Sequence, residues 1–123
     1  MSRSQPRNLI RDAIIDRLSA RADVDAHPCE RRAGPTKYIA AFVNKRGTAF
    51  AVDLMSASKQ PIWFLDRPEL RSKLEAAGVD YELYPPKRGR NSNLHKIPGF
   101  KHGALIRAYP EDVDSAMRIV DML

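Results

Sequence analysis

Hydrophobic residues recur along this chain at two spacings, one typical of helices and one typical of strands. Apolar positions three or four residues apart predict three helices, which cover 6–22, 66–77 and 110–123. Shorter runs rich in aliphatic and aromatic residues predict five strands, over 36–43, 48–54, 61–65, 79–84 and 103–109. No element is predicted in 23–35, 55–60 or 87–102. The predicted order is α-β-β-β-α-β-β-α.

Turn and cap residues mark where these elements begin and end. Gly47 lies in the turn 44–47, which joins the first two strands into a hairpin because glycine accepts the positive φ of such turns. Asp66 is expected to cap the second helix, with Glu69 in a capping-box position. Gly78 is expected to end that helix.

Together the elements predict the α+β class, with a single mixed β-sheet of about five strands and helices packed on it. The β-α-β step from 61 to 84 favours a parallel pair of strands, whereas the hairpin is antiparallel. The first and last helices are expected to cover the inner face of the sheet, because each has an apolar stripe. All 123 residues are assigned to one domain, with 1–7 as a flexible basic arm that carries Arg3 and Arg7.

The composition is that of an ordinary globular domain, with 43% hydrophobic and 29% charged residues. No apolar run approaches the roughly 20 residues of a membrane helix, and residues 1–7 are too polar for a secretory signal. The single cysteine, Cys29, can form neither an internal disulfide nor a multi-cysteine zinc site. These features predict a cytoplasmic protein with no membrane partner.

The positive charge of the chain is concentrated in one stretch. Lys and Arg total 21 and Asp and Glu total 15, which gives a net charge of +6. The window 84–110 contains no acidic residue and six cations, so the rest of the chain has 21 − 6 = 15 cations against 15 anions and is neutral. A local cationic excess of this kind is typical of proteins that bind a polyanion.

Side chains in and near this window suit a nucleic acid, and we predict non-catalytic binding of DNA or RNA. Arginine and lysine contact phosphates, asparagine can pair with base edges, and Tyr84 and Phe100 can stack on bases if they face outward. Two further cations lie at the hairpin turn. The predicted nucleic-acid-binding residues are Lys87, Arg88, Arg90, Asn91, Asn93, Lys96, Lys101, Arg107, Lys45 and Arg46.

Two other functions and one purely structural interpretation remain open at this stage. The same charge suits a protein-interaction module, such as an inhibitor, chaperone or adaptor, that binds an acidic protein partner or forms a homodimer. A small metal-dependent nuclease would require Asp53, Glu82 and His95 to converge in a pocket. Alternatively, the basic stretch is a solvated loop that Leu94, Ile97 and Phe100 pin to the core.

Catalytic and cofactor-binding motifs are weak or missing in the sequence. There is no phosphate-binding loop and no dinucleotide fingerprint. His27 and Cys29 flank a proline in a predicted loop, which is a poor arrangement for a nucleophile and its base. His95 and His102 are two metal-ligand types without a partner carboxylate nearby. We therefore predict no catalytic residue, no metal site and no cofactor.

Overall fold

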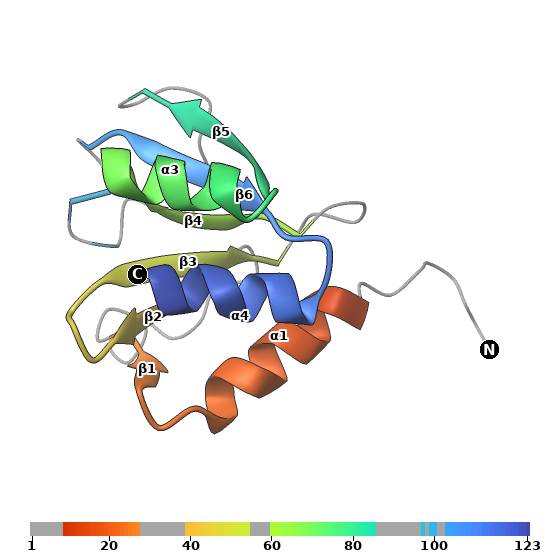
Figure 1. The fold of residues 1–123 in the computed structure, drawn as a ribbon. Helices are drawn as coiled ribbons and strands as arrows, with labels where there is room; N and C mark the ends of the chain where they lie inside the picture. The colour runs from red at the N-terminus through yellow and green to blue at the C-terminus, as the bar shows by residue number, and fades with distance from the viewer. Residues whose placement is uncertain (1–8, 28–38, 55–59, 86–96, 98, 101–102) are drawn as a thin grey trace.

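A computed structural model describes residues 9–27, 39–54, 60–85, 97, 99–100 and 103–123 (Figure 1). The helices in these ranges are α1 (Leu9–Ala20), α3 (Pro68–Ala76) and α4 (Val113–Met122). The strands are β1 (Val24–Ala26), β2 (Ile39–Asn44), β3 (Ala49–Asp53), β4 (Ile62–Leu65), β5 (Asp80–Tyr84) and β6 (Leu105–Tyr109). The α+β class and the single sheet are confirmed. The short strand β1 was not predicted, because three residues with a single buried side chain, Val24, carry too little pattern to separate them from a loop.

The six strands form one sheet in the order β1-β2-β3-β4-β6-β5. All five neighbouring pairs are antiparallel, so the prediction of a mixed sheet with a parallel pair is wrong. Strands β4 and β5 do run in the same direction across α3, but β6 lies between them. Burial explains this order. Strand β6 is buried at Leu105, Ile106 and Ala108, whereas β5 is largely exposed and suits the sheet edge.

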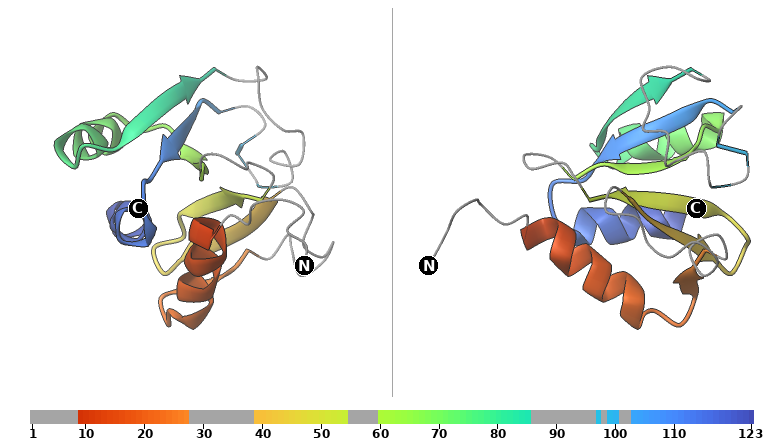
Figure 2. Two further views of the ribbon diagram at one scale, coloured as in Figure 1. Left: turned by 90° about the vertical axis from the view of Figure 1, so that its right-hand side faces the viewer. Right: turned by 180° about the vertical axis from the view of Figure 1, so that it is seen from behind.

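All three described helices lie on one face of the sheet, with α4 between α1 and α3 (Figures 1 and 2). Their apolar stripes meet the strand side chains that point to this face, among them the stacked pair Phe42 and Phe50. The helix residues that are buried in this core are Ile14, Leu18, Leu70, Leu74, Ala116, Ile119 and Val120. The prediction that the first and last helices cover the sheet is thus confirmed, and α3 joins them.

The ends of the helices agree only in part with the predicted caps. Asp112 caps α4, because its carboxylate accepts a hydrogen bond from the Ser115 backbone N–H at 2.8 Å. Gly78 follows α3 with a φ of 72°, as predicted for a helix stop. Asp66, however, does not cap α3: the N-cap residue is Arg67, which makes no side-chain cap. The Asp66 carboxylate instead accepts a hydrogen bond from Arg71 Nε at 2.9 Å.

The opposite face of the sheet has a second, smaller core, which we call the helix-free face because no described helix lies on it. Ile97 and Phe100 are fully buried there against Trp63 and Leu105. The predicted anchoring of the basic stretch by Ile97 and Phe100 is therefore confirmed, whereas Leu94 lies outside the described residues. The helix-free face is where side chains of β4, β5 and β6 meet the base of the 85–104 connection.

Candidate nucleic-acid interface

The structure describes three of the ten residues predicted to bind nucleic acid, namely Lys45, Arg46 and Arg107. The other seven lie outside the described residues, as do the predicted basic arm 1–7 and the histidines at 95 and 102. The described residues nevertheless show where the basic stretch leaves and rejoins the sheet, and what surrounds Arg107.

The connection 85–104, which carries five of the six cations of the window 84–110, leaves β5 and enters β6 at the same end of the sheet as the β2–β3 turn. Tyr84, the last residue of β5, pairs with Leu105, the first residue of β6. The register carries across the sheet from Leu83 through Ile106 and Phe64 to Phe50, at the start of β3. The turn that carries Lys45 and Arg46 directly precedes β3, so this sheet end gathers the turn and both attachment points of the basic stretch (Figure 1).

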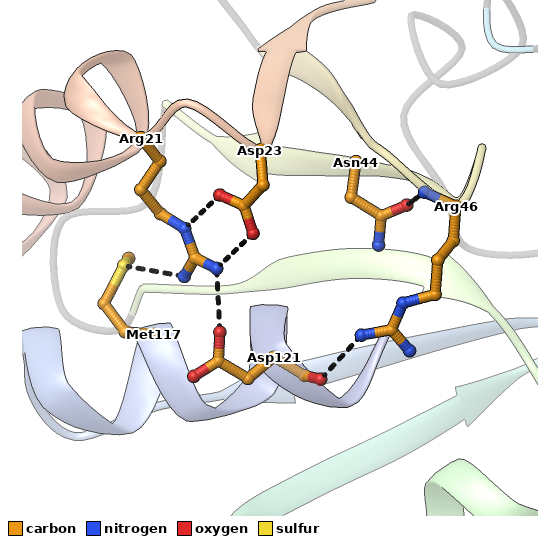
Figure 3. A network of polar contacts seen from close by, with 6 residues as sticks. All are labelled: Arg21, Asp23, Asn44, Arg46, Met117 and Asp121. Carbon is orange, nitrogen blue, oxygen red and sulfur yellow. Dashed lines mark hydrogen bonds and ion pairs between the residues drawn. The ribbon is translucent and has the colours of Figure 1, made fainter.

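The β2–β3 turn is held by the side chain of Asn44. Its Oδ1 accepts hydrogen bonds from the backbone N–H groups of Arg46 and Thr48 at 2.9 and 3.0 Å. The Arg46 guanidinium donates to the backbone oxygen of Asp121 at 3.3 Å and so reaches the C-terminal end of α4 (Figure 3). A cation at this end of a helix is electrostatically favourable. Arg46 therefore makes a structural contact with α4, and both Arg46 and Lys45 are exposed.

Beside this turn, Arg21 joins two carboxylates in what we call the Arg21 clasp (Arg21, Asp23 and Asp121). The guanidinium donates to both Asp23 oxygens at 2.8 and 2.7 Å and to Asp121 Oδ1 at 2.8 Å (Figure 3). A cavity of about 220 Å³ is lined by the clasp, by Val120 and by Asn44, Lys45 and Arg46. The clasp ties the end of α1 to the end of α4, and its own carboxylates balance much of the charge in the cavity.

The clasp should make stability depend on acid. Hydrogen bonds from Arg21 hold the pKa of Asp23 below its ordinary value. A depressed folded-state pKa contributes stability above the ordinary value of about 4, and this contribution is lost as the pH falls through the folded value. We expect Arg21→Ala to lower the melting temperature by a few degrees near neutral pH and to flatten the loss of stability below about pH 4.

Circular dichroism melts of wild type and variant across this pH range would measure both effects. Arg17→Ala is the matched control, since Arg17 pairs with Asp114 at 3.4 Å through an exposed side chain. Its acid profile should follow that of the wild type. Parallel profiles for Arg21→Ala and wild type would show that Asp23 is not a source of the acid sensitivity.

Arg107 lies at the centre of a polar and aromatic cluster on the helix-free face. Within the sheet it pairs with Trp63 of β4 on one side and Glu82 of β5 on the other. Its guanidinium carbon lies 5.2 Å from the Trp63 ring centroid and 5.3 Å from that of Tyr109. Its Nη1 donates to the Tyr84 hydroxyl at 3.2 Å. We call Trp63, Glu82, Tyr84, Arg107 and Tyr109 the Arg107 cluster.

Two buried donors in this cluster have no acceptor. Among the buried side-chain nitrogens and oxygens of the described residues, Trp63 Nε1 and Arg107 Nε have no hydrogen-bond partner. The Trp63 side chain is only 3% exposed. A buried donor without an acceptor costs about 1–3 kcal/mol, so such groups in folded proteins call for a ligand, a bound water or a functional reason. Here both donors belong to side chains that face each other.

Carboxylates keep the cluster from being strongly cationic. Asp53 lies 3.8 Å from Arg107, and Glu82 accepts a hydrogen bond from the Tyr109 hydroxyl. Burial raises the pKa of Tyr109, and the hydrogen bond to Glu82 adds to this effect. Burial lowers the pKa of Arg107, but the hydrogen bond to Tyr84 and the nearby charges outweigh it, so the net pKa is raised. Arg107 is thus a cation and Tyr109 a neutral phenol at physiological pH.

The cluster also bears on the nuclease alternative. Asp53 and Glu82 do lie on the same face, but Arg107 stands between them in the sheet. In the described part of the chain, no group of three or more His, Cys, Asp or Glu residues is arranged to hold a metal ion. Asp53 contacts the Arg107 guanidinium and Glu82 contacts the Tyr109 phenol, whereas His95, the third residue of the nuclease hypothesis, lies outside the described residues.

The aromatic residues play different parts from those predicted. Phe100 is fully buried and cannot stack on a base. Tyr84 is half-buried, with its ring edge against Trp63 at a centroid distance of 4.9 Å. Trp63 and Tyr109 were not predicted as site residues, because in the sequence they read only as strand residues. The signal for this site is that Trp63 and Arg107 are paired on neighbouring strands and point to the same face. The pairing register of the strands is needed to recognise it, and the sequence does not give that register.

No helix in the described ranges is both long enough and apolar enough to cross a bilayer. Comparisons of the chain with protein families, with curated proteins and with solved structures find no match.

Proposed function

We propose that this protein binds nucleic acid, DNA or RNA, without catalysing a reaction on it. The observation that carries the proposal is the charge distribution: six cations and no acidic residue in 84–110, in a chain that is otherwise neutral. Counterion release from a nucleic acid by such a segment supplies affinity that does not depend on sequence. We place this activity in the cytoplasm, the compartment predicted from the single cysteine and the other sequence features.

The fold supports the proposal in two ways. The connection 85–104 leaves β5 and enters β6 at one end of the sheet, and the turn that carries exposed Lys45 lies at this same end. Ile97 and Phe100 fix the base of the stretch to the helix-free face. Anchoring lowers the conformational entropy that the stretch loses on binding.

The test is a binding titration with labelled duplex DNA, single-stranded DNA and RNA at several salt concentrations, followed by fluorescence anisotropy. If six phosphate contacts form, log affinity for duplex DNA should fall against log salt with a slope of about −5. No binding to any of the three at about 50 mM salt would contradict the proposal, because the electrostatic contribution is large there. The acidic protein partner would then be sought by pull-down from nuclease-treated lysate.

A further inference from the structure

The Arg107 cluster has the hydrogen-bonding character of a site for an acceptor group. Trp63 and Arg107 are neighbours in the β4–β6 register, and each has a buried N–H without an acceptor among the described residues. Both groups can only donate. A ligand that satisfies them must therefore present an oxygen or a nitrogen lone pair at this face.

The charge around the two donors selects against a phosphate. Asp53 lies 3.8 Å from Arg107, and Glu82 faces it from β5 in the same row of the sheet. One guanidinium is thus accompanied by two carboxylates, which would repel a phosphate but tolerate a neutral acceptor. A neutral carbonyl oxygen or ring nitrogen fits this environment better.

The surroundings are also aromatic. The rings of Trp63, Tyr84 and Tyr109 border the guanidinium, and the two tyrosines are half-buried at the surface. The ligand that fits is therefore neutral and planar, with lone pairs on its edge, and a nucleobase has these three properties. Bases that are held in a duplex have their pairing edges occupied, whereas those of a single strand are available to proteins.

We infer that Trp63 Nε1 and Arg107 Nε donate hydrogen bonds to the edge of one unpaired base of a single-stranded nucleic acid, with the tyrosine rings beside it. This inference rests on the proposed function and assigns to it a preferred ligand, single strand over duplex. The other five cations of 84–110, together with exposed Lys45, supply six contacts to phosphates, and the Arg107 cluster supplies the contact to a base.

Trp63 is the only tryptophan in the chain, so its fluorescence reports on this site alone. The experiment titrates the wild-type protein with three probes of equal length: a single-stranded oligothymidylate, the same strand without bases, and a duplex. Anisotropy of a label on the probe and emission of Trp63 are recorded together. We expect all three probes to bind. Only the base-bearing single strand should quench Trp63, and it should bind at least about fivefold more tightly than the abasic strand, as a base–aromatic contact implies.

The other outcomes contradict either the base-binding site, base recognition or the proposed function. Binding of the base-bearing strand without a change in Trp63 emission overturns the site and leaves the proposed function standing. Equal quenching by the abasic strand shows that a phosphate is bound and overturns base recognition. The absence of any anisotropy change contradicts the proposed function and this inference with it.

A conservative variant tests the donor itself. Arg107→Lys keeps the positive charge and removes the Nε–H, so the preference for the base-bearing over the abasic strand should fall to about one, with an unchanged salt slope. Arg21→Lys is the matched control, because it makes the same exchange in the Arg21 clasp, and it should keep the preference. A full preference in Arg107→Lys overturns the assignment. The wild-type titration remains decisive if that variant fails to fold.

Discussion

Replacing Arg88, Arg90 and Lys96 together with alanine should weaken binding to duplex DNA by about 100- to 500-fold at about 0.1 M salt, since each phosphate contact contributes close to eightfold there. The physical reason is the loss of counterion release from three of six cations in the acid-free window. The slope of log affinity against log salt should fall from about −5 to about −3. Fluorescence anisotropy across a salt series measures both quantities.

The chain offers a control that removes the same charge elsewhere. Arg17, Lys73 and Arg118 are exposed cations of α1, α3 and α4, on the face of the sheet opposite Arg107. Their joint replacement with alanine lowers the net charge by the same three units, from +6 to +3. This variant should keep most of the affinity and the salt slope. If the two triple variants lose equal affinity, net charge alone drives binding and the basic stretch has no special role.

Phe100→Ala should lower the free energy of unfolding by about 3–5 kcal/mol, the usual cost of removing a buried phenylalanine ring. Phe100 is fully buried in the core of the helix-free face, and its backbone N–H donates to the Ile97 carbonyl at 3.0 Å. The truncation leaves a cavity beneath the point where the basic stretch rejoins the sheet. Urea denaturation followed by circular dichroism measures the change.

Leu83→Ala provides the comparison, because Leu83 on the edge strand β5 is 48% exposed. Its cost should stay within about 0.5 kcal/mol. Phe100→Ala keeps every cation, so the salt slope of nucleic-acid binding should remain at about −5 in conditions where the variant is folded. Equal stability of the two variants would mean that Phe100 is not an anchor. A reduced salt slope in Phe100→Ala would mean that the number of phosphate contacts depends on the anchoring of the basic stretch by Phe100.

Local spacing was sufficient to predict most elements, because helix and strand formation depend on side chains close in sequence. The helix that follows Pro110 has apolar residues at every third or fourth position, and α4 buries that stripe. The hairpin around Gly47 was predicted from the glycine and the two alternating runs, and the structure confirms it with a φ of 85°. Asp66 failed as a cap because the nearby Arg71 competes for its carboxylate.

Neighbours within the sheet could not be predicted in the same way. The step from β4 through α3 to β5 leaves room for one strand between them, and β6 fills it after a connection that carries no periodicity. Insertion of β6 depends on its burial on both faces, which is a property of contacts between residues far apart in the chain. The antiparallel sheet is a consequence of that insertion.

The candidate interface likewise has one part that the sequence predicts and one part that depends on the tertiary structure. The excess of cations in 84–110 is a sum over residue types, so the sequence carries it whatever the fold. The surroundings of Arg107 are different in kind, since Trp63, Asp53 and Glu82 come from three other strands and meet it only through the register. Charge content is additive along a chain, whereas hydrogen bonding and burial depend on which side chains pack together. Arg107 is therefore one of six basic residues in the window 84–110 of the sequence, and the centre of an aromatic, charge-balanced cluster in the folded protein.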